Sequence, residues 1–153
     1  MSQHSVTIEW SRGTQPFTDG RYSRAHHWRF DGGAIVAASS SPHVVREPFS
    51  DAANVDPEEA YVAALSSCHM LWFLSVAAAE GYCVDSYCDQ AMGHMTRTAD
   101  GREWIDRVEL RPSVAFSGAR QPDAADIARL HHRAHASCFI ANSVRTEVIV
   151  HTR

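Results

Sequence analysis

The chain has 153 residues, which is enough for one domain with a sizeable core. Its hydrophobic share of 44% and its charged share of 21% are ordinary for a globular protein. The formal net charge of -4 gives no electrostatic reason to expect a nucleic acid or a membrane surface as partner. We therefore predict a single globular domain over residues 1–153.

The N-terminal residues 1–10 contain no basic segment followed by an apolar run, so they do not have the pattern of a signal peptide. This predicts a cytoplasmic protein. In that compartment the four cysteines are expected to serve as thiols or as a redox pair rather than as a structural disulfide framework.

The first part of the chain predicts a small antiparallel sheet. Strands are expected over residues 5–10, 21–30 and 34–38. The second of these would place Tyr22, Arg24 and Trp28 on one face, and Asp31-Gly32-Gly33 predicts the hairpin that follows it. Residues 39–55 predict a loop, and a loop of this length in a compact domain is often functional.

A long helix is the main predicted element. Asp56 is a good N-cap, Pro57 suits the first helical position, and the next two residues are glutamates that complement the positive helix end. Residues 60–79 are apolar nearly all round, which predicts burial on most sides, and Gly81 is a natural end.

Two consequences follow from the apolar body of this helix. Its length approaches that of a membrane span, but Ser66, His69 and Ser75 interrupt it and no basic residues flank it, so we predict that it does not cross a membrane. A helix this apolar also needs cover on more sides than one small sheet supplies, which predicts a homodimer that sandwiches the helices.

The second half of the chain predicts strands, a helix and a closing strand. Strands are expected over residues 82–98, with a break near Gly93, and then over 104–116 and 145–151. Pro112 predicts an edge position or a bulge. A second helix is expected from Pro122-Asp123 to about Ser137, followed by a short helical segment over residues 139–144. This order favours an α+β fold with antiparallel hairpins.

Two cysteine contexts resemble the signatures of the OsmC/Ohr family of thiol peroxidases. Asp-Pro-Glu-Glu at 56–59, followed by an Ala-rich run into Ser-Cys-His at 67–69, resembles the first signature. Cys138 followed by Phe-Ile-Ala-Asn-Ser-Val resembles the second. Tyr-Ser-Arg-Ala-His at 22–26, followed by Phe-Asp-Gly-Gly, is similar to the OsmC-like branch. The resemblance covers nearly the whole chain in the family's order.

The resemblance implies an OsmC-like fold, with antiparallel sheets around two central helices in an intertwined homodimer, and reduction of organic or fatty-acid hydroperoxides. The thiolate of Cys68 would attack the peroxide and become a sulfenic acid, and Cys138 would condense with it to a disulfide. An external dithiol, for which a lipoyl-type compound is a candidate, would reset the pair. No cofactor is expected.

The resemblance also implies that a glutamate and an arginine assist the thiol. Glu58 matches the family glutamate, but it precedes Cys68 by ten residues, or roughly 15 Å along one helix. It would therefore have to hold an arginine that reaches the thiol from a loop or across the subunit boundary. Arg24 is the first choice because it shares a predicted strand face with Tyr22. The alternatives are Arg21, Arg46 and, for the acid, Glu59.

The expected substrate pocket is apolar and lined from the region of residues 65–74. We predict that its walls include Leu65, Leu71, Trp72 and Phe139; the preference for organic peroxides is implied by the family. Phe139 stands where many members carry Pro, which would alter the start of the following helical turn. His69 points about 100° away from Cys68 on a helix, so a packing role is as reasonable as stabilisation of a thiolate.

Other readings of these residues stay open. Cys83 and Cys88 match nothing functional in the family and are predicted to be structural or surface thiols. His131, His135 and Cys138 fall at i, i+4 and i+7 of a helix, a spacing that suits zinc, with Cys68 as a fourth ligand. The same fold could also hold an apolar ligand without turning it over. The walls would then be Trp72, Phe73 and Trp104.

Overall fold

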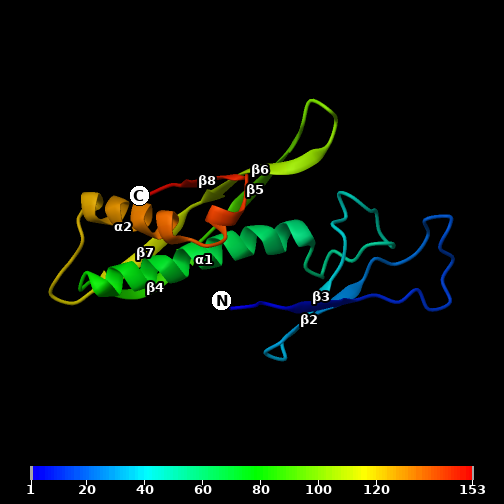
Figure 1. Ribbon diagram of the computed structural model, residues 1–153, viewed down its shortest axis with the longest axis horizontal. Helices are drawn as coiled ribbons and strands as arrows, with labels where there is room; N and C mark the ends of the chain where they lie inside the picture. Colours follow the sequence, from blue (N-terminus) through cyan, green and yellow to red (C-terminus); the bar gives the residue numbers. More distant parts are fainter. Residues whose placement is uncertain (1, 153) are drawn as a thin grey trace. The chain divides into compact units, whose positions relative to one another are not determined.

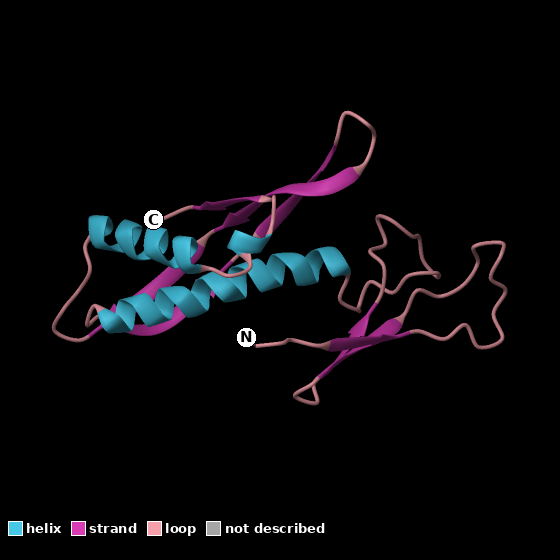
Figure 2. Ribbon diagram, viewed as in Figure 1, coloured by secondary structure: helices cyan, strands magenta, loops and turns pink. Residues whose placement is uncertain are grey.

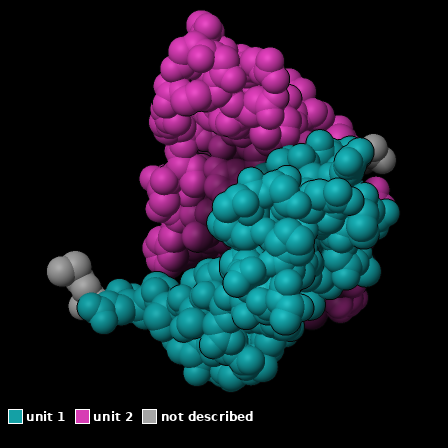
Figure 3. All heavy atoms as spheres, turned by 90° about the vertical axis from the view of Figure 1, so that its right-hand side faces the viewer, with its two compact units in different colours: residues 1–60 teal, residues 61–153 magenta. Residues whose placement is uncertain are grey.

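The computed structural model describes residues 2–152. The chain forms two compact units, residues 1–60 and residues 61–153, which are coloured separately in Figure 3. Unit 1 holds the first three strands and the first turn of helix α1, and unit 2 holds the remainder of α1, a second helix and five strands (Figure 1). The prediction that residues 1–153 make one domain stays a prediction.

Unit 1 is a small antiparallel sheet with long loops on either side of its strands (Figure 2). Its strands are β1 (Val6–Glu9), β2 (His26–Phe30) and β3 (Ile35–Ala38), in the order β1-β2-β3. Trp28 at the centre pairs with Ile8 on one side and Val36 on the other. Gly33 adopts φ +87° in the predicted hairpin, where a side chain would be strained.

The second strand is shorter than predicted, because residues 21–25 belong to a loop. The backbone N–H of Arg24 donates to the carbonyl of Phe49 at 2.9 Å, and its guanidinium donates to the carbonyls of Gly20 and Tyr22. These bonds hold residues 21–25 in a loop conformation. The predicted strand face shared by Tyr22 and Arg24 is therefore wrong, although the two side chains do lie together.

Helix α1 runs from Pro57 to Ala79. The carboxylate of Asp56 accepts from the backbone N–H of Glu59 at 2.7 Å, and the Glu59 carboxylate accepts from the N–H of Asp56 at 3.1 Å. This reciprocal pair is a capping box, so the predicted start of the helix is confirmed. Gly81, at φ +79°, ends it as expected.

Unit 2 contains two sheets. The strands are β4 (Cys83–Asp89), β5 (Met92–Arg97), β6 (Glu103–Leu110), β7 (Pro112–Ser117) and β8 (Glu147–Val150). Strands β4 and β7 form one antiparallel pair, and β5-β6-β8 form a three-stranded sheet. Each of the two long strands predicted here is split between the sheets, the first at residues 90–91 rather than near Gly93, and the second at Arg111.

The two breaks are joined to each other. The carboxylate of Asp89 accepts a hydrogen bond from the backbone N–H of Arg111 at 2.6 Å, so both chain segments leave one sheet and enter the other at the same place. Pro112, which has no N–H to donate, begins β7 immediately after this crossing. Pro112 lies on an edge strand, as predicted, because β7 and β4 form a two-stranded sheet, and this strand begins at the change of sheet.

The last strand departs from the predicted antiparallel pattern. Helix α2 (Ala124–Ser137) and the short 3-10 helix η1 (Ala141–Ser143) follow β7, and β8 then pairs with β6 in parallel. A parallel pairing requires a long crossover connection, which β7, α2 and η1 supply. The α+β class is unaffected.

Unit 2 buries two clusters of apolar side chains under α1. Leu65, near the start of the helix, packs with Val108 and Leu110 of β6. Phe73 and other residues of its second half pack with α2 and the β4-β7 sheet; the buried members are Phe73, Val76, Ala77, Tyr82, Leu130 and Ala134. The predicted burial on most sides is not reached within one chain, since only 28% of an 18-residue apolar window of α1 is buried. By length and composition alone the same helix could cross a membrane, a weak signal that apolar core helices share.

Gly93 allows β5 to approach α1 closely. A Cβ at this position would lie 2.7 Å from Cγ2 of Val62, and valine at a helical position has little rotamer freedom with which to yield. We expect Gly93→Ala to lower the free energy of unfolding by about 1–3 kcal/mol in urea titrations. Gly32→Ala is the matched control, because nothing lies within 4 Å of its Cβ position.

The clash itself is tested by the double variant Gly93→Ala/Val62→Ala. It should be more stable than the sum of the two single effects predicts. Additive losses would show that Val62 is not the obstacle.

Candidate functional site

Cys68 and Cys138, seventy residues apart in the sequence, meet in unit 2. Cys68 lies on α1 and is half-buried; Cys138 follows the last turn of α2 and is 1% exposed. Cys68 lies close enough to Cys138 to raise its pKa, and both thiols are free. The structure therefore brings together the two cysteines that the family resemblance pairs.

Local capping places Cys138 at the end of α2. The carboxylate of Asp123 accepts from the backbone N–H of Asp126 at 2.8 Å, and a reciprocal bond completes the capping box that starts the helix. At the other end the N–H of Cys138 donates to the carbonyl of His135 at 3.2 Å. The helix ends there and the thiol turns toward α1.

The two thiols differ in their surroundings. Burial and the nearby Cys68 raise the pKa of Cys138 to about 11, while the N–H of Ala141, 3.4 Å from its sulfur, acts in the opposite direction. Cys138 is therefore protonated near neutral pH, and Cys68 is the thiol that solvent can reach. The helical turn still directs an N–H at the sulfur although Phe139 stands at its start.

A buried pair of imidazoles lies beside the thiols. His69, the residue after Cys68, and His131 of α2 are both almost fully buried, and Nε2 of His69 lies 3.0 Å from Nδ1 of His131. Their rings are nearly parallel, at 7°, and Phe73 stacks on the His131 ring at 4.3 Å. The packing role considered for His69 is thus realised together with a polar bridge.

Both imidazoles are neutral at physiological pH. Burial lowers the pKa of His69 to about 4, with further lowering by His131 and His135 and an opposing effect of Asp89. Burial alone lowers the pKa of His131 to about 4. In a neutral pair one ring donates and the other accepts, so the contact is a hydrogen bond.

Arg24 and Glu58 lie in unit 1, where they line one pocket of about 460 Å³. The Arg24 guanidinium lies 3.8 Å from the centre of the Tyr22 ring, and Trp10 and Phe17 contact the same ring. Within residues 2–152, no ion pair joins the two charges. The exposed Arg21 and Arg46 do not line this pocket, and Glu59 serves the helix cap.

The four predicted pocket residues are found in two environments. Leu71 is 60% exposed and Phe139 is 70% exposed, and Trp72 packs edge-on against Phe139 with ring centres 5.4 Å apart. Leu65 is buried in the core beneath β6 and presents no surface. Trp72 and Phe139 therefore form an apolar contact on unit 2, and Leu71 is exposed on α1.

The alternative sites are not assembled. Across residues 2–152, no group of three or more His, Cys, Asp or Glu side chains could hold a metal ion, so the cluster of His131, His135 and Cys138 does not form a zinc site. Of the aromatic walls of the ligand-binding alternative, Phe73 is fully buried and presents no surface, and Trp104 lies beneath the Arg145 guanidinium.

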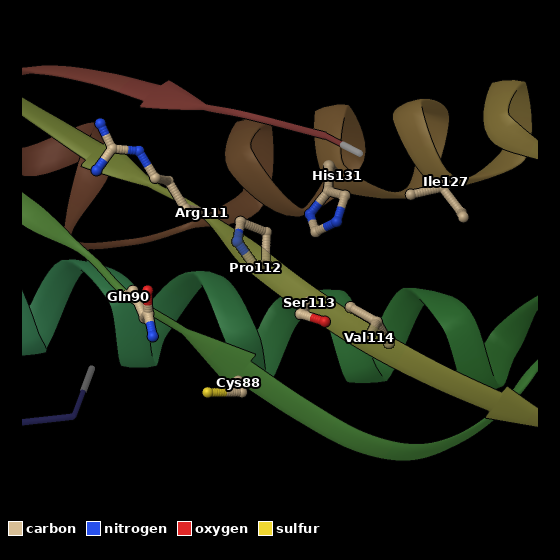
Figure 4. A pocket seen from close by; sticks show the side chains of 8 residues that line it. All are labelled: Cys88, Gln90, Arg111, Pro112, Ser113, Val114, Ile127 and His131. Carbon is tan, nitrogen blue, oxygen red and sulfur yellow. The ribbon is translucent and has the colours of Figure 1, made fainter.

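A second cavity, of about 310 Å³, lies in unit 2 between the β4-β7 sheet and α2 (Figure 4). It was not predicted from the sequence. Cys88, Arg111 and His131 are among its lining residues. Cys88 and Cys83 are exposed, as predicted for surface thiols. The spacing of His131 on α2 gave no signal for the cavity, because its walls come from three separate segments.

Comparison with known proteins identifies relatives. Residues 50–153 match the family described as OsmC-like protein. The structure superimposes with a TM-score of 0.96 on an OsmC-like protein of unknown function from Vibrio cholerae, which is 54% identical and matches over 99% of each chain. No curated protein matches the chain.

More distant solved structures share the fold. The organic hydroperoxide resistance protein OhrB of Bacillus subtilis has a TM-score of 0.69 at 18% identity, over 99% of this chain and 98% of that one. An organic hydroperoxide resistance protein from Elizabethkingia anophelis has a TM-score of 0.71 at 15% identity, over 98% and 93%. The OsmC-like fold predicted from the sequence is confirmed.

The neutral histidine pair makes stability depend on pH. Because the pKa of His69 and that of His131 are both lowered to about 4 from 6.5, the unfolded chain binds more protons between these values. Stability should be complete above pH 6.5 and fall as the pH drops to 4, by on the order of 3 kcal/mol for each of the two rings. Urea midpoints measured across this range test it.

The double variant His69→Gln/His131→Asn should lose most of this dependence, since amides do not titrate here. An unchanged pH slope in the double variant would show that other groups cause the acid instability.

Proposed function

The chain belongs to the OsmC-like protein family, and on this premise we propose that it is a thiol-dependent peroxidase that reduces organic hydroperoxides. The observation that carries the proposal is the meeting of Cys68 and Cys138, both as free thiols, at the junction of α1 and α2. Two cysteines at this sequence separation come into contact only if the fold brings them together.

The proposed reaction has three steps. The thiolate of Cys68 attacks the terminal peroxide oxygen, the O–O bond breaks, and the alkoxide takes a proton and leaves as an alcohol. The sulfur of Cys138 then attacks the Cys68 sulfenic acid, releasing water and forming a disulfide. An external dithiol, for which a lipoyl-type compound is our candidate, reduces this disulfide by exchange.

The difference between the thiols supports this order. Cys68 is the more accessible, so it meets the peroxide first. The raised pKa of Cys138 keeps it protonated, and hence unreactive toward peroxide, until a sulfenic acid forms beside it. The proposal implies a reducing compartment such as the cytoplasm, where the free thiols are maintained.

We propose that Arg24, with Glu58, assists the thiolate of Cys68. Arg24 lies within the segment similar to the OsmC-like branch, and both residues line one pocket whose other walls include Trp10, Phe17 and Tyr22. A guanidinium stabilises a thiolate and can bind a peroxide oxygen. The preference for organic hydroperoxides over hydrogen peroxide is part of the proposal and rests on the family resemblance.

We also propose that the protein is a homodimer. The apolar face of α1 and the exposed Leu71 and Phe139 need cover, because exposed apolar surface of this extent is unusual for a monomer. A second copy of the chain, which carries the same apolar face, would supply it.

Titration of the reduced protein with cumene hydroperoxide tests the proposed reaction. We expect two of the four thiols per chain to be lost, as counted by free-thiol assay and intact mass. Cys68→Ser should abolish the loss, because no peroxidatic sulfur remains, whereas the matched variant Cys83→Ser should lose two thiols as before. Persistence of all four thiols in the unaltered chain would contradict peroxidase activity.

Arg24→Ala should slow the oxidation of Cys68 by cumene hydroperoxide roughly 10- to 100-fold, since it removes a charged donor from the reacting groups. Stopped-flow measurement of the single-turnover rate checks this. The exposed Arg46 gives the matched control, Arg46→Ala, which should react normally. Equal rates in Arg24→Ala and the unaltered chain would remove Arg24 from the mechanism.

Size-exclusion chromatography with light scattering should give a mass of twice the 17.0 kDa of the chain. Leu71→Glu, which places a charge on the exposed apolar surface, should shift the protein toward monomer. A monomer at every concentration for the unaltered protein would contradict the dimer.

A further inference from the structure

We infer that His69 and His131 are positioning residues for the Cys68–Cys138 pair: their hydrogen bond holds α1 and α2 in the register at which the two sulfurs can join. The inference rests on the dithiol chemistry proposed above. It assigns a task to two buried side chains that the proposed reaction does not otherwise use.

The helix geometry links the imidazole pair to the thiol pair. On α1, His69 directly follows Cys68; on α2, His131 precedes Cys138 by seven residues, which is close to two turns and returns to the same face. Nε2 of His69 lies 3.0 Å from Nδ1 of His131. Any sliding of one helix along the other that parted the sulfurs would also break this bond.

The bond is the directional contact in the buried, apolar part of the interface; at the surface, Glu80 at the end of α1 also pairs with Arg129 and Arg133 of α2. Phe73 stacks on His131 at 4.3 Å, and Leu130 and Ala134 of α2 are fully buried in the same cluster. Apolar surfaces tolerate small shifts, whereas a buried hydrogen bond fixes distance and direction because its unpaired partners would be costly. The imidazoles thus fix the register in the buried part of the interface, beside the thiol pair, where apolar packing alone leaves it adjustable.

The hydrogen bond requires at least one of the two rings to be neutral. His69 faces His131 and His135 of α2 and Asp89 of β4, whereas His131 lines the cavity that also contains Cys88 and Arg111 (Figure 4). Protonation of both rings would set two positive charges 3.0 Å apart in a buried place. Closure of the disulfide should therefore weaken in acid, separately from any effect on the thiols.

The test measures disulfide closure without peroxide. Equilibration of the protein in buffers of reduced and oxidised dithiothreitol gives the equilibrium constant for the Cys68–Cys138 disulfide, read by intact mass after acid quench. His69→Leu removes the hydrogen bond, and His69→Gln places an amide nitrogen near the position of Nε2. His132→Asn is the matched control, because His132 is exposed on α2 beside His131.

We expect His69→Leu to lower this equilibrium constant roughly tenfold, His69→Gln to recover at least half of that change on a logarithmic scale, and His132→Asn to leave it unchanged. In the unaltered protein the constant should also decrease below pH 5, a decrease that is absent from His69→Gln/His131→Asn. Equal constants in His69→Leu and the unaltered chain would overturn the inference.

Two further comparisons decide the outcome if a variant does not fold or if the protein does not reduce peroxide. If His69→Leu does not fold, as judged by circular dichroism, the comparison passes to the double amide variant, and the same pH profile in that variant and the unaltered protein would overturn the inference. If the unaltered protein forms the disulfide in dithiothreitol but does not consume cumene hydroperoxide, the proposed function fails while the positioning role stands.

Discussion

The contact between α1 and α2 is the interaction on which the rest of unit 2 depends. Phe73, Leu130 and His131 meet there, and the β4-β7 sheet packs against both helices, whereas the β5-β6-β8 sheet packs against α1 (Figure 1). Because α2 ends at Cys138 and α1 carries Cys68 near its middle, the packing of the two helices brings the sulfurs together. The reactive pair is thus a consequence of the core rather than of a mobile loop.

Cys68 also lies where α1 passes from one buried cluster to the other. Leu65, one turn before it, packs on β6, and Phe73, beyond it, packs on α2 and the β4-β7 sheet. The change of sheet at Asp89 and Arg111 occurs in the same part of the unit, and the Asp89 carboxylate also accepts from the hydroxyl of Ser66 on α1. Polar groups of Ser66, Asp89 and Arg111 therefore lie in the part of unit 2 where α1 passes between the two apolar clusters.

Local signals predicted the helices well, and long-range contacts explain what was missed. The caps at Asp56 and Asp123 depend on side chains three residues apart, so they are visible in the sequence. The splitting of two long strands depends on the bond between Asp89 and Arg111, which alternation of apolar residues cannot reveal. The parallel pairing of β8 with β6 likewise depends on the path of the chain through α2.

The candidate site was likewise predictable from the sequence where local motifs mark it, and not where it depends on long-range contacts. The family signatures identified Cys68 and Cys138, whereas the partner of His69 could not be found from the sequence, because spacing within α2 pointed instead to zinc.

The most direct test of the proposed dithiol chemistry is peptide mapping of the protein after one equivalent of cumene hydroperoxide. We expect one disulfide-linked peptide pair, containing Cys68 and Cys138. A disulfide through Cys83 or Cys88, or oxidised Cys68 with no disulfide, would contradict that chemistry.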